Sequence, residues 1–254
     1  MQRIYASYES EGLSNHNTPK EPAMEYTGKE LEAMAFAVNY HRWIIEEFRS
    51  YLGKNVVEVG AGCGDLSALI LEMGVDHLHA FEPSTNQFTL LEHRFKSDPR
   101  VSLSNGFFSS DSAPRYIDSI VYINVLEHIE NDEGELHSVY ESLDPGGRVL
   151  VFVPAHAWLF SEADREMGHF RRYSKRELRQ RVEKVGFVVE KFKYMDLAGI
   201  APWYVNFVML KNSFSAKSVA VYDRYVVPPM KHLERFIGPP VGKNLLVVGN
   251  KKIL

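Results

Sequence analysis

The sequence of 254 residues has one cysteine, no long apolar run and no excess of positive charge. Cys63 alone can form neither an intrachain disulfide nor a zinc site of several cysteines, which favours a reducing, cytoplasmic location. The most apolar late stretch, 197–210, is too short for a membrane-spanning helix, which needs roughly 20 residues. Residues 1–20 lack the apolar core of a signal peptide. We therefore expect a cytoplasmic protein without a membrane span.

The charge balance argues against a nucleic-acid partner. The chain has 29 Lys and Arg against 33 Asp and Glu, a formal net charge of -4. Binding to a phosphate backbone depends on clustered positive charge, which this composition does not favour. Apolar residues make up 45% of the chain, so a packed core can form without disulfides or metals.

Three parts of different composition follow one another along the chain. Residues 1–22 are polar and contain glycine, asparagine and proline, so we expect a flexible N-terminal arm. Residues 23–53 carry apolar side chains at helical spacing and predict an N-terminal helical cap. The rest, 54–254, is expected to form the ligand-binding core, with a helical, aromatic insertion at 196–244.

Strand and helix patterns alternate in the core, which predicts an α/β fold with a mostly parallel sheet. Ser174 and Glu177 form a capping box that opens a helix, and Gly186 ends it. The other helices are expected to follow the first strand and to cover 86–95 and 133–143. The strands are expected at 56–59, 77–82, 101–103, 118–125, 148–153, 187–195 and 245–251.

The strongest local signal lies between an expected strand and an expected helix. There an acidic residue and three glycines stand at every second position: Glu58, Gly60, Gly62 and Gly64. Glycines let the chain turn sharply there and expose bare backbone to a ligand near the positive end of the helix. The dinucleotide fingerprint has its third glycine three positions after the second, where this chain has Asp65. The spacing favours a nucleotide-like ligand other than NAD.

Glu82 ends the second expected strand, about 20 residues beyond the glycine loop, where nucleotide-binding folds place an acidic residue. A carboxylate only accepts hydrogen bonds, so it can take both hydroxyl protons of a ribose. A tight turn and a solvated strand end would explain the glycines and Glu82 when each is considered alone. Their joint placement favours a ribose-binding site.

Four segments of the core are characteristic in combination: 57–64, 81–83, 124–129 and 143–148. With them, the chain from about 56 to 189 resembles the class I S-adenosylmethionine-dependent methyltransferases, in particular their small-molecule branch. The resemblance implies a Rossmann-like sheet with helices on both faces, mostly parallel, with the antiparallel edge pairing of the last strand that is typical of the family. It also implies S-adenosylmethionine as the cofactor.

The resemblance assigns cofactor contacts to residues at the ends of the strands. Tyr40, in the N-terminal helix, would reach over the cofactor, although ordinary helix packing explains it as well. The other contacts are Glu58, Gly60, Ala61, Gly62 and Gly64 for the amino-acid part, Glu82 and Pro83 for the ribose, Asn105, Gly106 and Phe107 for the adenine, and Asn124, Val125 and Leu126 beside the methionine part.

Two histidines are candidates for the base that takes the proton of the methyl acceptor. His128 lies just past the fourth expected strand, and His169 lies in 164–173, a segment dense in titratable groups that also supplies Tyr173 as a third catalytic candidate. An imidazole with a pKa of about 6.5 suits proton removal from a hydroxyl or an amine. A backbone-bonded histidine at a helix start, and a solvated salt-bridged loop, are the structural alternatives.

No metal is expected, because the ten histidines are scattered and none is paired at i, i+4 on a helix. The aromatic side chains of 196–244 can line an apolar acceptor pocket, form a dimer face, contact a membrane surface or simply pack against other helices.

The sequence thus predicts methyl transfer to an oxygen or nitrogen of a small-molecule acceptor, with a lipid or natural product mildly favoured. A cofactor-binding partner protein without turnover is the alternative, and a nicotinamide dehydrogenase is disfavoured. The acceptor and the oligomeric state stay open.

Overall fold

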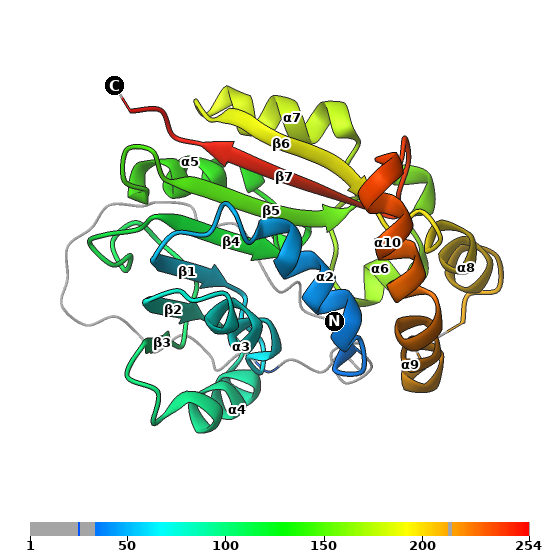
Figure 1. Ribbon diagram of the computed structural model, residues 1–254, viewed down its shortest axis with the longest axis horizontal. Coiled ribbons are helices and arrows are strands. Elements are labelled where there is room, and N and C mark those ends of the chain that lie inside the picture. The colour runs from blue at the N-terminus through cyan, green and yellow to red at the C-terminus, as the bar shows by residue number, and fades with distance from the viewer. Residues whose placement is uncertain (1–24, 26–33, 213–214, 254) are drawn as a thin grey trace.

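The computed structural model describes residues 25, 34–212 and 215–253, so the arm predicted at 1–22 lies outside the described residues. Seven strands form one sheet in the order β3-β2-β1-β4-β5-β7-β6 (Figure 1). The strands are β1 (Asn55–Val59), β2 (His77–Phe81), β3 (Val101–Ser104), β4 (Ser119–Ile123), β5 (Arg148–Pro154), β6 (Val188–Met195) and β7 (Asn244–Asn250).

The first five strands pair in parallel, and β7 pairs antiparallel with both β5 and β6. The α/β fold and the mostly parallel sheet with an antiparallel last strand are confirmed. The expectation that the last strand pairs at the edge is wrong, because β7 lies inside the sheet and β6 forms the edge. An apolar run such as 245–248 is typical of a strand covered on both faces, whereas β6 carries charged Glu190, Lys191 and Lys193, as edge strands do.

Helices cover both faces of the sheet (Figure 1). Because side chains alternate along a strand, Val56 packs toward the N-terminal helices while Val57 packs toward the opposite layer. One layer contains α2 (Val38–Phe48), α3 (Asp65–Glu72) and α4 (Thr85–Phe95); the other contains α5 (Asp132–Ser142) and α7 (Lys175–Lys184). The capping box expected at Ser174 and Glu177 is present at the start of α7.

The helical pattern predicted over 23–53 is interrupted at Ala37, and residues 26–33 lie outside the described residues. Ala37 is not helical, with φ -92° and ψ 45°, and α2 starts at the next residue. The carboxylate of Asp223, far along the chain, accepts hydrogen bonds from the backbone N–H groups of Asn39 (3.0 Å) and Tyr40 (2.8 Å). These are first-turn donors that a helix leaves unpaired, so a tertiary contact supplies the cap that the local sequence lacks.

The segment between β6 and β7 is helical and lies at the carboxyl ends of β4 and β5 (Figure 1). Its elements are α8 (Ile200–Trp203), the π-helical turn η3 (Tyr204–Met209), α9 (Ala216–Tyr225) and α10 (Val227–Ile237). Three short elements precede β6 in the chain: the 3-10 turns η1 (Leu126–His128) and η2 (Ala157–Leu159), and α6 (Glu162–Glu166). Among the described residues, no helix has the length and apolar character needed to cross a membrane.

Candidate active site

The glycine loop joins β1 to α3 at the point where the strand order reverses, which is where open α/β sheets bind ligands. Gly62 has φ 56°, and a Cβ added to it would meet no described atom within 4 Å, so its backbone faces open space. Gly64 has φ 88°, but a Cβ there would lie 2.6 Å from the Phe95 ring. Gly62 is thus shaped for a ligand, whereas Gly64 allows α3 to pack on α4.

Glu82 follows β2 and is 6% exposed. Its Oε2 accepts a hydrogen bond from the backbone N–H of Gly62 (2.8 Å), and its Oε1 accepts one from Ser84 (2.8 Å). Burial raises the pKa of Glu82 above its ordinary value, while these two backbone donors oppose the rise. Each oxygen keeps a lone pair for a further donor, such as a ribose hydroxyl.

Residues expected near the adenine lie on the next strand connection and are tied to Glu82. The side-chain amide of Asn105 donates to the Glu82 backbone carbonyl (2.9 Å), and the N–H of Gly106 donates to the same oxygen (3.1 Å). The loop after β3 is therefore held beside the carboxylate that would bind the ribose. This is the arrangement that a nucleoside needs, with a sugar site and a base site next to each other.

Glu58 is a buried carboxyl group beneath the glycine loop. The Ser67 hydroxyl donates to its Oε2 (2.5 Å), and burial raises the pKa of Glu58 to about 8. The Ser67 bond and Arg94 oppose the rise, whereas Glu82 adds to it. The folded pKa lies above the unfolded one, so the contribution of Glu58 to folding is complete below about pH 4.5 and is lost as the pH rises through about 8.

The neutral variant Glu58→Gln should therefore be more stable than the wild type at alkaline pH. Glutamine can still accept from Ser67 and avoids an ionised group in the core. We expect equal free energies of unfolding near pH 5 and a gain of roughly 1–4 kcal/mol near pH 9, since one pKa unit is about 1.4 kcal/mol. Urea unfolding at both pH values measures this. A gain that does not depend on pH, or a similar gain in the exposed control Glu92→Gln, would contradict it.

A cavity of about 620 Å³ opens beside the glycine loop, within the usual range for small-molecule sites of about 300–1,000 Å³. It reaches from the loop across the carboxyl end of β4 to the helices between β6 and β7. Of the residues expected to bind the cofactor or act in catalysis, those that line it are Tyr40, Gly60, Ala61, Gly62, Asn124, His128 and His169. The fold thus brings the cofactor loop and both candidate histidines to one cavity.

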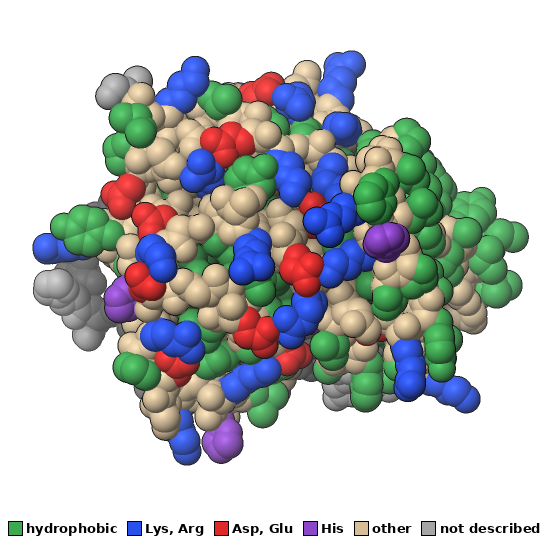
Figure 2. Space-filling model, in the orientation of Figure 1, with side chains coloured by type: hydrophobic (Ala, Val, Ile, Leu, Met, Phe, Trp, Pro, Cys, Tyr) green, Lys and Arg blue, Asp and Glu red, His purple; other side chains and the backbone are tan. Residues whose placement is uncertain are grey.

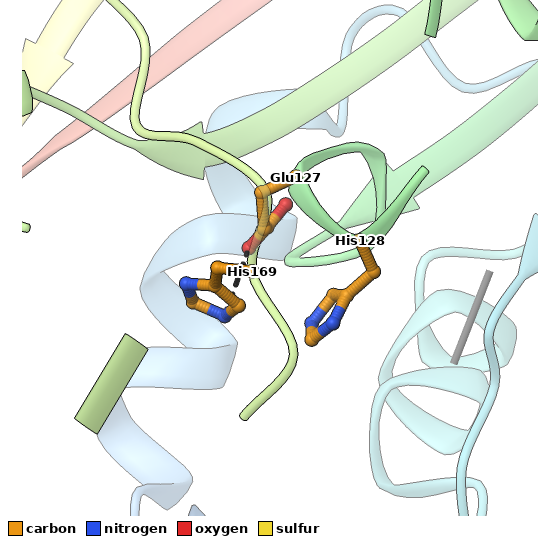
Figure 3. Close-up of side chains that lie close together, drawn as sticks. All are labelled: Glu127, His128 and His169. Carbon is orange, nitrogen blue, oxygen red and sulfur yellow. Dashed lines mark ion pairs between the residues drawn. The ribbon is translucent and has the colours of Figure 1, made fainter. Parts of the chain in front are cut away.

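The lining of this cavity contains a cluster of Glu127, His128 and His169, shown in Figure 3. Glu127 and His128 come from the turn after β4, and His169 comes from the loop after α6. The backbone N–H of Phe170 donates to the Glu127 carbonyl (2.9 Å), which holds the two segments together. The imidazole rings of His128 and His169 pack edge to face, with their centroids 4.6 Å apart.

Burial shifts the pKa values of the titratable groups in this cluster. Glu127 is fully buried, and within the described part of the chain neither of its carboxylate oxygens has a hydrogen-bond partner; His169 Nε2 lies 4.0 Å from Oε1. Burial raises the pKa of Glu127 to about 7, against the opposing effect of His169. Burial also lowers the pKa of His128 well below its ordinary value, and His169 lowers it further. Such perturbed groups in a cleft are typical of functional sites.

His169 is oriented by a buried network. Its Nδ1 lies 2.9 Å from Asp164 Oδ1, which also accepts from Nε of Arg172 (2.8 Å). Ser161 donates to the other oxygen of Asp164 through its N–H and its hydroxyl, both at 2.8 Å. Burial alone would raise the pKa of Asp164, but its bonds to His169 and Arg172 hold it below the ordinary value. Nε2 of His169 is thereby directed to the cluster.

Several predicted site residues are placed elsewhere. Tyr173 is 1% exposed, is absent from the described cavity lining, and donates to Asp132 (2.7 Å) and to the Leu126 carbonyl (3.2 Å), so we do not retain it as a catalytic candidate. Val125 and Leu126 are buried core residues behind the turn. The others outside the described lining are Glu58, Gly64, Glu82, Pro83, Asn105, Gly106 and Phe107.

Sequence reasoning missed Glu127, Asp164 and Arg172. Glu127 was visible as a carboxylate next to a histidine at the end of a strand, where parallel sheets carry their sites. Asp164 and Arg172 lie in the segment singled out for its density of polar groups. The solvated-loop alternative describes Arg165, which forms an exposed ion pair with Glu162, but it does not describe the buried pair of Asp164 and Arg172.

The sheet order, the glycine loop after β1 and the carboxylate after β2 are those of the class I S-adenosylmethionine-dependent methyltransferase fold. The chain belongs to the methyltransferase domain family, whose pattern matches residues 36–191. This match includes the glycine loop, Glu82 and the cluster of Glu127, His128 and His169. S-adenosylmethionine is accordingly the cofactor of the class, and the open backbone at Gly62 and the acceptor oxygens of Glu82 fit it.

Known proteins resemble parts of the chain. Over 112 residues it is 25% identical to the mitochondrial ubiquinone biosynthesis O-methyltransferase of Schizosaccharomyces pombe, a match that covers 42% of this chain and 40% of that relative. The chain thus matches less than half the length of that relative. This leaves the acceptor of the present protein to be proposed from its own cavity.

Two solved structures share the fold. A S-adenosylmethionine-dependent methyltransferase from Archaeoglobus fulgidus has a TM-score of 0.59 at 16% identity, covering 87% of this chain and 99% of that one. A phosphoethanolamine N-methyltransferase 2 of Haemonchus contortus, solved with phosphomonomethylethanolamine and S-adenosylhomocysteine, has a TM-score of 0.60 at 16% identity, covering 90% of this chain and 58% of that one. At these identities the likeness shows the fold alone.

Proposed function

We propose that this protein transfers a methyl group from S-adenosylmethionine to an oxygen or nitrogen of a small-molecule acceptor. The observation that carries the proposal is the single cavity lined both by the glycine loop and by His128 and His169. The cofactor would supply an electrophilic methyl group on its sulfonium. Because His128 and His169 line the same cavity, they would lie beside an acceptor that meets this methyl group in line.

The chain's own residues would then have three tasks. Glu82 would accept from the ribose hydroxyls, and the bare backbone at Gly62 would lie against the amino-acid part of the cofactor. His169, held by Asp164, would take the proton of the acceptor, with His128 beside it. Alignment of two reactants in such a cavity can lower the activation free energy by roughly 7–11 kcal/mol.

The acceptor is proposed to have an apolar body. Trp203, Phe207 and Tyr222, from the helices between β6 and β7, also line the cavity. The guanidinium of Arg172 lies 4.4 Å from the centre of the Trp203 ring, so a positive charge stands beside this apolar wall. A phenol, catechol or amine attached to an aromatic or lipid body would suit such a lining.

The test is a methylation assay with S-adenosylmethionine and a panel of phenols, catechols and amines that carry apolar tails. Mass spectrometry would detect products one methyl group heavier, together with S-adenosylhomocysteine. We expect at least one member of the panel to be methylated. Saturable cofactor binding with no product from any acceptor would favour the alternative function, a cofactor-binding partner protein without turnover.

A peripheral membrane contact is the partner that we propose for the outer surface of the same helices. Hydrophobic side chains gather at the right-hand end of the face in Figure 2, over the helices between β6 and β7. The exposed apolar residues of this segment include Tyr204, Val205, Met209, Leu210, Phe236 and Ile237. A surface of this kind lets an enzyme reach an acceptor that is dissolved in a lipid layer.

We expect the protein to sediment with anionic phospholipid vesicles. The double variant Met209→Glu with Leu210→Glu should reduce the bound fraction at least threefold, because both side chains are more than half exposed and would bring charge to the lipid surface. Leu90→Glu, at an exposed apolar residue on α4, is the control and should bind as the wild type does. Equal sedimentation of all three proteins would contradict this contact.

A further inference from the structure

We propose that Glu127, His128 and His169 bind a divalent transition-metal ion of the zinc type at the acceptor end of the cavity, and that this ion binds the acceptor oxygen. The ion's role rests on the proposed function. The site itself rests only on the geometry of the three side chains and on the groups that support them, which the next paragraphs describe.

The three residues converge on one point. Their ligand atoms, one from each side chain, all lie within 4.8 Å of one another (Figure 3). A zinc ion with bonds of about 2.0–2.2 Å sets its ligand atoms about 3.3 Å apart, so side-chain movements of about 1 Å complete the coordination. Within the described residues the carboxylate oxygens of Glu127 have no hydrogen-bond partner, although the group is fully buried. A cation would satisfy this carboxylate, whose burial is otherwise costly.

A second observation points to the same ligand. Histidines that bind metals usually donate their other ring N–H to a carboxylate, which fixes the ring and its tautomer. Asp164 lies 2.9 Å from Nδ1 of His169, and Arg172 and Ser161 hold it in place. Nε2 of His169 is the atom left for the cluster, and it lies on the side of Glu127.

The chemical types of the three ligands favour some metal ions over others. Two imidazoles and one carboxylate suit zinc and similar transition metals, whereas magnesium and calcium prefer sets made of oxygen ligands. Three protein ligands with a remaining open position are typical of catalytic rather than structural zinc. All three residues line the cavity, so the open position would face the acceptor.

The chemistry follows from coordination. A hydroxyl bound to the ion has a lowered pKa, so its proton leaves to solvent before methyl transfer. The acceptor oxygen then forms a bond to the methyl carbon as the carbon–sulfur bond breaks, and the electron pair of that bond remains on S-adenosylhomocysteine. No oxidant or reductant is required. In the loaded protein, His128 and His169 act as ligands, and the ion takes over the activation of the acceptor.

The test is a titration of chelator-treated, untagged protein with Co²⁺, a spectroscopic substitute for zinc, followed by its visible absorption. We expect one equivalent to bind and Zn²⁺ to displace it. Glu127→Gln and His169→Ala should each weaken binding at least 100-fold, whereas the control His137→Ala, at an exposed histidine on α5, should bind normally. The readout needs neither cofactor nor acceptor, so it can fail or succeed independently of methyl transfer.

A further variant addresses the supporting carboxylate. Asp164→Asn keeps all three ligands but weakens the partner of His169, and we expect Co²⁺ binding to fall about 10–100-fold, as for other supporting groups around metals. The proposal would be overturned if the wild type showed no visible band at one equivalent. It would also be overturned if Glu127→Gln, which preserves size and shape, bound Co²⁺ as tightly as the wild type.

Discussion

Glu82→Ala is expected to weaken S-adenosylmethionine binding about 100-fold or more, measured by calorimetric titration. The side chain is buried at the end of β2, and its two oxygens bridge the backbone of Gly62 and Ser84. Removal would take away the acceptor for the ribose hydroxyls and loosen the glycine loop at the same time. Hydrogen bonds to a charged group contribute about 1.5–3 kcal/mol each, and two of them account for this loss.

A matched control separates binding from stability. Asp118 is also a carboxylate that accepts from two backbone N–H groups, those of Lys54 (2.8 Å) and Asn55 (2.7 Å), but it lies at the amino end of the sheet. Asp118→Ala should lower the melting temperature and leave cofactor affinity within about twofold of the wild type. Equal losses of affinity in both variants, or unchanged affinity in Glu82→Ala, would show that Glu82 does not bind the ribose.

His169→Ala is expected to reduce turnover about 100- to 1,000-fold while S-adenosylmethionine affinity stays within about twofold, because proton transfer by a positioned side chain typically contributes this much. The imidazole lines the cavity in the cluster with Glu127 and His128, whereas Glu82 lies outside the described lining. Its loss would remove the group that we propose to take the acceptor's proton or, in a metal-loaded protein, one of the three proposed ligands. Single-turnover assays with a responsive acceptor measure the effect.

Two companion variants sharpen this test. Asp164→Asn should give an intermediate loss of turnover, because the hydrogen bond that orients His169 is weakened while the imidazole remains. His137→Ala changes an exposed histidine outside the described lining of the cavity and should leave turnover unchanged. Full turnover in His169→Ala would remove His169 from the catalytic role that we assign to it.

The fold could be predicted closely because its signals are local. The strand β5 is a buried apolar run that ends at Pro154, and the capping box of Ser174 and Glu177 marks the start of α7. Two features depend on partners distant in sequence. The start of α2 is set by Asp223, and the position of β7 inside the sheet depends on pairing with both β5 and β6. The contact with Asp223 leaves no signature in the residues that adjoin α2, and the interior position of β7 is indicated only by its apolar run.

The candidate site also has some features with local sequence signals and others that depend on residues distant in the chain. The glycine loop and Glu82 could be predicted because a few neighbouring residues determine the turn and the strand end. The cluster of Glu127, His128 and His169 could not, because it forms only when the loop after α6 pairs with the turn after β4 through Phe170. Spacing along the chain gave no reason to expect a metal, whereas the fold places a buried carboxylate and two imidazoles at one point.

The central claim is that the cavity beside Gly62 and Glu82 binds S-adenosylmethionine. The most direct test is calorimetric titration of the wild-type protein with S-adenosylmethionine and, in parallel, with NADH. The account predicts saturable binding of S-adenosylmethionine at one site and no binding of NADH, since Asp65 stands where the dinucleotide fingerprint requires a glycine. Failure to bind S-adenosylmethionine, or binding of NADH in its place, would contradict it.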